Sequence, residues 1–176
     1  VEDRTLITNK NFKQADDLIY LCGTTYPEFG GSELQKMLEG EISGCPPHLD
    51  LELEKRLQGQ VTEAIRAGVI QSAHDLSEGG LAVAMTECLV DSGFGAQIDL
   101  GSDLVSELFS ESQSRFLLSV RPEDQETFEK IVEATLLGRV SAEPVLRITN
   151  SEGVTLSLEL EQLIQAWKGA LPCLLS

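Results

Sequence analysis

The segment from Ala73 to Leu89, AHDLSEGGLAVAMTECL, constrains the fold of this chain more strongly than any other. Its second half carries apolar residues at helical spacing, namely Leu81, Ala84, Met85, Cys88 and Leu89. Offsets of three, four, seven and eight residues place these side chains on one buried face of a helix. Residues 69–73 are apolar enough to form a short strand. The sequence therefore predicts a strand, an acidic turn, a glycine pair and a helix.

A turn of this kind can bind a ligand, because the first N–H groups of a helix lack intrahelical partners and carry partial positive charge. Gly79 and Gly80 allow a close approach because neither has a Cβ. Asp75 is suited to hold a magnesium ion, a ribose hydroxyl or a backbone amide. In the structural alternative, Asp75 or Ser77 caps the helix and the glycines only permit close packing. The residues alone leave both alternatives open.

Charge and composition disfavour several classes of protein. The chain has 29 acidic and 13 basic side chains and a formal net charge of −16. This charge repels phosphate backbones, so we expect no nucleic-acid partner. No apolar run approaches the roughly 18 residues that cross a membrane, so we expect a cytoplasmic protein with no membrane partner. The cysteines are too scattered for a zinc or redox motif and stand at Cys22, Cys45, Cys88 and Cys173.

The remaining patterns predict both strands and helices. Apolar runs predict strands over 18–23, 96–100 and 116–120, and a hairpin with arms at 146–148 and 154–158. Helical spacing predicts helices over 34–38, 53–65, 104–109, 122–135 and 160–167. This order is not a uniform alternation of strand and helix. We therefore expect an α+β fold, a mixed α/β sandwich whose mixed sheet has four or more strands with packed helices.

Individual residues carry further expectations. Ser32 is placed to cap the helix that follows it. Thr135 is expected on the inner face of its helix, and Trp167 is expected to anchor the core. Glu111 and Arg115 are close enough in sequence to form an ion pair. The first 17 residues are polar and begin without methionine, so we expect a connecting segment over 1–17, a single domain over 18–176, and a longer parent polypeptide.

Five segments resemble the aminoimidazole ribonucleotide synthetase superfamily, in the order in which that superfamily has them. They are FGGSEL at 29–34, AHDLSEGGL at 73–81, LFSESQSRFLLSV at 108–120, LLGRV at 136–140 and LEQLIQAWKGALP at 160–172. Within the superfamily, the best match is the phosphoribosylformylglycinamidine synthase family. There the chain resembles the C-terminal domain of the second half of the synthetase subunit. The resemblance implies the fold of the C-terminal domain of aminoimidazole ribonucleotide synthetase.

The resemblance implies part of an ATP-dependent C–N ligase of purine biosynthesis. That family uses ATP and Mg²⁺ to activate the amide oxygen of formylglycinamide ribonucleotide, as an iminophosphate, and ammonia from a glutaminase subunit then displaces phosphate. The implied partners are the remaining domains of the synthetase chain, the glutaminase subunit and a small accessory subunit. The family's catalytic histidines lie in a domain outside this sequence. No residue here is therefore expected to be catalytic, and the chain alone is expected to be inactive.

The resemblance also assigns places to single residues. In the first half of that family's chain, the acidic turn and the ESQ segment are expected to touch magnesium and substrate. Here the corresponding residues belong to the second copy, where they either form an auxiliary nucleotide site or preserve the architecture. Asp75 is the expected metal ligand, and His74 is expected to have a structural role. The expected ligand-binding residues are Asp75, Ser77, Gly79, Gly80, Glu111, Ser112 and Gln113.

Two alternatives remain at this stage. The chain can belong to another member of the same superfamily, although the ESQSRF segment and the AWKGALP tail argue against this. It can also be a structural or interaction module whose glycine turn binds no ligand. Under that alternative, replacing Asp75 or Gly80 changes folding or docking and leaves ligand affinity unchanged.

Overall fold

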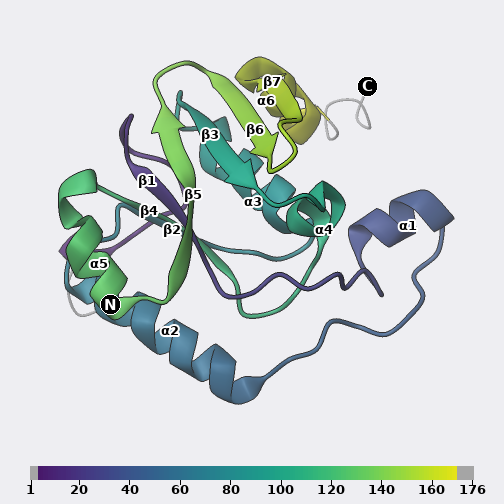
Figure 1. Cartoon of the computed structure of the whole chain (residues 1–176), viewed down its shortest axis with the longest axis horizontal. Helices are drawn as coiled ribbons and strands as arrows, with labels where there is room; N and C mark the ends of the chain where they lie inside the picture. Colours follow the sequence, from purple (N-terminus) through teal and green to yellow (C-terminus); the bar gives the residue numbers. More distant parts are fainter. Residues whose placement is uncertain (1–3, 170–176) are drawn as a thin grey trace.

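Seven strands form one mixed sheet in the computed structural model, which describes residues 4–169 (Figure 1). The strands are β1 (Leu18–Cys22), β2 (Ser72–Asp75), β3 (Gly95–Leu100), β4 (Phe116–Val120), β5 (Ala134–Ser141), β6 (Val145–Asn150) and β7 (Thr155–Glu159). Their order across the sheet is β2-β4-β1-β5-β3-β6-β7. Neighbouring strands are antiparallel, except for the parallel pair β3 and β6. The expected mixed sheet and α+β fold are therefore confirmed.

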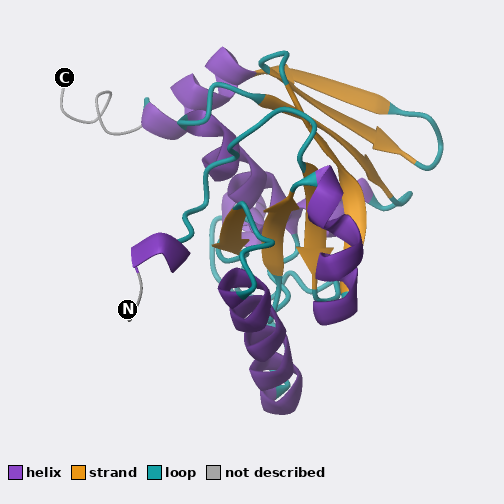
Figure 2. Cartoon of the chain, turned by 90° about the vertical axis from the view of Figure 1, so that its left-hand side faces the viewer, coloured by secondary structure: helices purple, strands orange, loops and turns teal. Residues whose placement is uncertain are grey.

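The helices cover the sheet from both sides (Figure 2). They are α1 (Glu33–Glu39), α2 (Leu51–Arg66), α3 (Gly80–Val90), α4 (Leu104–Phe109), α5 (Gln125–Ile131) and α6 (Leu160–Lys168), with short 3₁₀ turns at Arg4–Leu6 and Pro122–Asp124. Residues of α3, α4 and α6 share one hydrophobic cluster with the sheet. Residues of α2 and α5 share the other. Helix α1 has no buried residue and stands apart from both clusters.

Strand β1 lies between these two clusters. Its five residues are all buried, because Ile19 and Leu21 join the α3 cluster while Leu18, Tyr20 and Cys22 join the α2 cluster. A strand covered on both faces needs apolar side chains throughout, which explains the uninterrupted run in the sequence. Helix α3 instead shows the expected helical period. All five of its predicted core residues are buried.

Three local predictions are wrong. The strand expected over 69–73 begins at Ser72 and continues to Asp75, because it pairs with β4 over those residues. Thr135 is an exposed residue of strand β5, since the helix ends at Ile131. Trp167 is 44% exposed. It lies in the last turn of α6, beyond Leu160 of the first turn, which joins the core cluster.

The segment before β1 contacts the rest of the fold. Phe12 is buried and its N–H donates to the carbonyl of Cys88 at 3.2 Å. The role of residues 1–17 as a connecting segment stays a prediction. Residues 1–3 of that segment, the end of the closing motif at 170–172 and Cys173 lie outside the described residues. Between residues 4 and 169, each helix is too short or too polar to span a bilayer.

Candidate functional site

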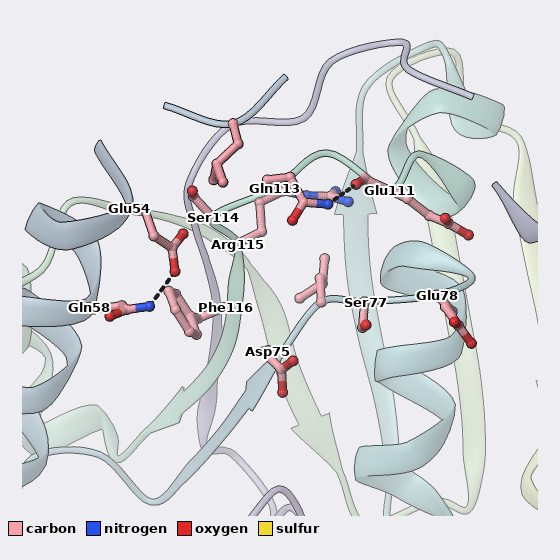
Figure 3. A pocket seen from close by; sticks show the side chains of 12 residues that line it. Glu54, Gln58, Asp75, Ser77, Glu78, Glu111, Gln113, Ser114, Arg115 and Phe116 are labelled. Carbon is pink, nitrogen blue, oxygen red and sulfur yellow. Dashed lines mark hydrogen bonds between the residues drawn. The ribbon is translucent and has the colours of Figure 1, made fainter. Parts of the chain in front are cut away.

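The turn after β2 and the segment between α4 and β4 lie side by side and frame a cavity (Figure 3). The N–H of Leu76 donates to the carbonyl of Arg115 at 2.9 Å, which continues the pairing of β2 with β4. The cavity has a volume of about 450 Å³. Its lining residues are Leu49, Glu54, Gln58, Asp75, Leu76, Ser77, Glu78, Glu111, Gln113, Ser114, Arg115 and Phe116.

The cavity brings together a part of the predicted site. Four of the expected ligand-binding residues line it, namely Asp75, Ser77, Glu111 and Gln113. The other three lie outside the lining, namely Gly79, Gly80 and Ser112. The acidic turn and the ESQ segment thus meet in space, as the two parts of one binding site must.

Asp75 is an exposed carboxylate in the cavity lining, as is Glu78. The side chain of Asp75 is 71% exposed, and one of its carboxylate oxygens lies 3.4 Å from Nδ1 of His74. The other ring nitrogen of His74, Nε2, contacts the carboxylate of Glu87 on α3. His74 does not line the cavity. These contacts give His74 the structural role that was expected.

Helix α3 begins without a side-chain cap. Gly79 is its N-cap residue, so the expectation that Asp75 or Ser77 caps the helix is wrong. Instead, Oε1 of Glu111 accepts the N–H of Gly79 at 2.8 Å. The same oxygen accepts the N–H of Glu33, the first residue of α1, at 2.9 Å. One carboxylate therefore satisfies an N–H group at the start of two helices, where negative charge is favoured.

The glycine pair has a structural reason within the chain. Gly80 has φ +63°, and a Cβ on it would lie 2.5 Å from the carbonyl oxygen of Ser110 and 2.8 Å from that of Leu108. Gly79 has φ +78°, and its Cβ would lie 2.3 Å from Val83. The close approach at both positions is therefore made by the chain itself. Ligand binding by these glycines stays a prediction.

The segment between α4 and β4 is held by a buried guanidinium. Arg115 is 1% exposed, and it donates from Nε to the carbonyl of Ser112 at 2.9 Å and from Nη1 to Oγ1 of Thr25 at 3.1 Å. It forms no ion pair with Glu111 among the described residues, so that prediction is wrong. Burial lowers the pKa of Arg115 to about 10, and the carboxylates of Glu28 and Glu111 oppose this shift. Arg115 therefore stays charged at neutral pH.

Ser112 fixes the neighbouring loop. It is 1% exposed, and its Oγ accepts the N–H of Tyr26 at 3.0 Å and donates to the carbonyl of the same residue at 3.1 Å. These contacts tie Ser112 to the loop at Tyr26, and Ser112 does not belong to the cavity lining.

The cavity is acidic. Four carboxylates line it, from Glu54, Asp75, Glu78 and Glu111, and among residues 4–169 the only lining cation is Arg115. Because the guanidinium donates to carbonyl and hydroxyl groups of the chain, little of its hydrogen-bonding capacity is left for a ligand. The lining suits a ligand that donates hydrogen bonds, or a phosphate that arrives together with a cation.

The donor set around Asp75 fits a magnesium ion only in part. Residues 4–169 contain no group of three or more His, Cys, Asp or Glu side chains placed to hold a metal ion. Mg²⁺ is commonly bound by one or two carboxylates together with waters and substrate phosphates. Exposed Asp75 can supply one such ligand, and the others would come from outside this chain's described residues.

Sequence patterns did not indicate several lining residues. Glu54 and Gln58 come from α2, far from the acidic turn in sequence, and face the cavity opposite Asp75 (Figure 3). Their contact with the site depends on the packing of α2 against the sheet, where Leu57 joins the cluster that includes Phe116, and no local pattern encodes this packing. Ser114 did carry a signal, because it lies within the ESQSRF segment. It has φ +61°, which is uncommon for a residue with a side chain.

Comparison with known proteins places this arrangement in context. Residues 14–151 match the family model described as AIR synthase related protein, C-terminal domain. The chain is similar to the solved structure of Thermotoga maritima PurL complexed with FGAR, with a TM-score of 0.80 and 19% identity over 92% of this chain and 30% of that chain. It is also similar to phosphoribosylformylglycinamidine synthase II from Thermotoga maritima, with a TM-score of 0.76 and 20% identity over 92% of this chain and 28% of that chain.

A more distant likeness extends beyond these proteins. Hydrogenase maturation protein HypE matches with a TM-score of 0.61 and 13% identity, over 86% of this chain and 55% of that chain. At these identities the likenesses show the fold. The chain spans less than a third of the length of the PurL chains it matches.

Proposed function

Because this chain belongs to the family of AIR synthase related proteins, as the C-terminal domain of that family, we propose that it forms part of a phosphoribosylformylglycinamidine synthase. In this proposal it is the C-terminal domain of the second half of the synthetase subunit. The full enzyme converts formylglycinamide ribonucleotide to its amidine with ATP and ammonia. The likeness to PurL structures complexed with FGAR and with ATP supports this proposal.

The observation that carries the proposal is the cavity between the acidic turn and the ESQ segment. Asp75, Ser77, Glu111 and Gln113 line it together, at the places that correspond to the ligand contacts expected in the first half of that family's chain. Asp75 is highly exposed, and no histidine or cysteine of the described part of the chain lines the cavity as a nucleophile or base. Such a site is suited to hold part of a ligand whose reacting groups are supplied elsewhere.

Magnesium and ATP enter the proposal through Asp75. When bound, Mg²⁺ neutralises phosphate charge and so permits a nucleotide to approach carboxylates. Asp75 would supply one oxygen ligand to the ion. Gln113 and Ser77 would position polar groups of the nucleotide or substrate by hydrogen bonds, while Glu111 remains bonded to the starts of α1 and α3.

An exposed apolar surface supports docking to further domains. Met37 and Leu38 of α1 are 75% and 72% exposed, and Val105 of α4 is 54% exposed. Leu38 and Val105 line the same groove, which has a volume of about 620 Å³. Exposed apolar groups gathered at one groove are typical of interaction sites. We propose the remaining domains of the synthetase chain as partners, with a glutaminase and a small accessory subunit in the complex.

Ammonium-dependent conversion of formylglycinamide ribonucleotide tests the proposal. We expect turnover by a synthetase chain that contains this sequence, and none by the 176-residue chain alone. Within the longer chain, Asp75→Asn should weaken nucleotide or substrate binding. Glu152→Gln removes another exposed carboxylate, in the β6–β7 turn, and should leave binding unchanged. Turnover by the 176-residue chain would contradict the domain role, and an inactive parent would contradict the reaction.

A structural module without a ligand is the second candidate. The glycine pair favours it, because the chain itself occupies the space next to both glycines. Under this alternative, Asp75→Asn leaves nucleotide and substrate affinity of the parent unchanged, as the Glu152→Gln control does. Assignment to another superfamily member, such as a hydrogenase maturation protein, is tested by the substrate profile of the same parent chain.

A further inference from the structure

Helix α1 stands away from the sheet and, together with the loops around it, forms an open groove (Figure 1). The groove has a volume of about 620 Å³, and its apolar lining is formed by Pro27, Phe29, Leu34, Leu38, Pro46 and Val105. Leu38 is 72% exposed, and Met37 and Ile42 add exposed apolar surface on the same segment. Apolar surface gathered in this way is typical of a site that a partner covers.

The walls of the groove are held by contacts within the domain. The N–H of Gly31 donates to the carbonyl of Ser43 at 2.9 Å, and Nε2 of Gln35 donates to Oγ of Ser43 at 2.8 Å. Gly30 lies against the backbone of Cys45, because a Cβ on it would lie 2.0 Å from the carbonyl oxygen of that residue. The groove is therefore preformed, which lowers the ordering cost of binding.

The rim of the groove is acidic. Glu39 lines it, and Glu33 and Glu41 are exposed at the start of α1 and just after its end. The one basic residue of α1, Lys36, already pairs with Glu33 at 3.1 Å. Such a rim attracts Lys and Arg side chains of a partner, and it repels a second copy of this chain, whose formal net charge is −16.

Glu28 provides an acceptor in the wall of the groove. Its Oε1 accepts the N–H of His48 at 3.1 Å, whereas its Oε2 is buried and has no hydrogen-bond partner among residues 4–169. Arg115, whose charge Glu28 stabilises, donates its hydrogen bonds to other groups. A buried acceptor without a donor is unfavourable, and a donor from a partner in the groove would satisfy it.

We propose that this groove binds a basic amphipathic segment of the remaining synthetase chain. Apolar side chains of the segment pack against Leu34, Leu38 and Val105, and its Lys or Arg side chains lie beside Glu28 and Glu39. This inference rests on the proposed function, because it takes the parent synthetase as the source of the segment. More than two thirds of each matched PurL chain lies outside the part that this chain covers. A segment of the same polypeptide has a high effective concentration, so docking needs little intrinsic affinity.

Alkylation of Cys45 in the parent chain tests whether the groove is covered. Cys45 lines the groove and is exposed in this domain. Peptide mass spectrometry should show about tenfold faster modification of Cys45 by iodoacetamide in Leu38→Ser than in the unmodified parent, because a covered thiol reacts only when the groove opens. Leu136→Ser is the matched control, since Leu136 is 46% exposed on β5 outside the groove, and it should leave the rate unchanged. Equal rates in all of these proteins would show an open groove and overturn the proposal.

Photo-crosslinking in the parent chain identifies the occupant. The photoreactive amino acid p-benzoylphenylalanine at position 38 should cross-link to one segment of the same chain, which carries apolar residues and an excess of Lys and Arg. Glu39→Lys should lower the yield of this cross-link by about fivefold or more, because it places like charges opposite each other. Glu152→Lys, in the β6–β7 turn, changes the net charge equally and should leave the yield unchanged.

The proposal is overturned by the absence of a cross-link, by a cross-link to a second copy of the parent, or by a cross-link to a segment without Lys or Arg. A yield that Glu39→Lys leaves unchanged would also overturn it. Turnover of formylglycinamide ribonucleotide by the same parent is measured separately. An inactive parent that still cross-links to a basic segment would contradict the proposed reaction and support the docking.

Discussion

Replacing Asp17 with asparagine should stabilise the folded chain at neutral pH. Asp17 precedes β1 and is completely buried, and neither carboxylate oxygen has a hydrogen-bond partner among residues 4–169. Burial raises the pKa of Asp17 from 3.8 to about 6, an effect that Arg121 opposes and Glu123 and Asp16 reinforce. The folded chain therefore favours the neutral form of this carboxyl group.

The sign of the pH dependence follows from this raised pKa. Below pH 3.8 the group is protonated in both the folded and the unfolded chain, and no penalty arises. As the pH rises toward 6, the unfolded chain ionises freely while the folded chain resists ionisation. Stability therefore falls over this range and reaches its full loss above the folded pKa. The raised pKa corresponds to about 3 kcal/mol at pH 8.

Asparagine has a similar shape and no charge at any of these pH values. Asp17→Asn should therefore recover most of this loss at pH 8 and little at pH 4. A change of about 3 kcal/mol corresponds to roughly 6–12 °C in melting temperature for a domain of this size. Thermal unfolding followed by circular dichroism between pH 4 and 8 measures the difference between the variant and the unmodified chain.

Asp99→Asn is the matched control, because Asp99 is exposed on β3. Its melting temperature should follow that of the unmodified chain over the whole pH range, apart from a small constant offset. Other carboxylates titrate in all three proteins and cancel in the comparison. Parallel curves for Asp17→Asn and the unmodified chain would show that Asp17 carries no desolvation penalty in the folded chain.

Two further substitutions test the helix junction by urea unfolding. Gly80→Ala should lower the free energy of unfolding by more than about 2 kcal/mol. Gly80 has a positive φ, and a Cβ on it would lie 2.5 Å from the carbonyl oxygen of Ser110. Gly153→Ala is the control, because Gly153 also has a positive φ but no atom lies within 4 Å of its Cβ position. An equal loss of stability in the two variants would contradict the packing explanation. Glu111→Ala should lower the free energy of unfolding by about 1–3 kcal/mol, because it removes the acceptor for the N–H of Gly79. Glu111→Gln keeps an oxygen acceptor and should lower it much less. Equal losses in the two variants would refute the acceptor role.

The fold could be predicted where one local pattern determines an element. The core face of α3 follows from helical spacing, and the continuous apolar run of β1 follows from burial on both faces. The predicted boundaries of elements are wrong where pairing with a strand distant in sequence sets them. β2 extends to Asp75 because Phe116 of β4 lies opposite it, and Thr135 is drawn into a strand by pairing with Leu21 of β1.

The candidate site shows the same division. The acidic turn stands out locally through its glycine pair, and the family resemblance identified the ESQ segment. The sequence patterns did not show that Glu111 would accept the N–H groups at the starts of two helices. They also did not predict that Glu54 of α2 lines the cavity, since that contact arises from the packing of α2 on the sheet.

The acidic lining leads to a last prediction about how a phosphate-bearing ligand can bind here. Four carboxylates face the cavity, and Arg115 donates its hydrogen bonds to the chain. The N–H of Gly79 at the start of α3 is likewise taken by Glu111. No strong anion-binding group of these residues is left for a bare phosphate. Nucleotide binding to a synthetase that contains this domain should therefore depend on Mg²⁺ at this cavity.

Calorimetric titration of the parent chain with ATP, with Mg²⁺ and with EDTA, measures that dependence. Asp75→Asn should reduce the contribution of this cavity to Mg²⁺-dependent affinity, because it removes the exposed carboxylate that can bind the ion. Glu54→Gln removes a carboxylate that repels phosphate and should instead improve nucleotide affinity in EDTA. Opposite changes in nucleotide affinity for the Asp75 and Glu54 variants would distinguish metal binding from charge repulsion of the phosphate. If both variants bound nucleotide alike with and without Mg²⁺, the cavity would not be a nucleotide site, and the structural alternative would be preferred.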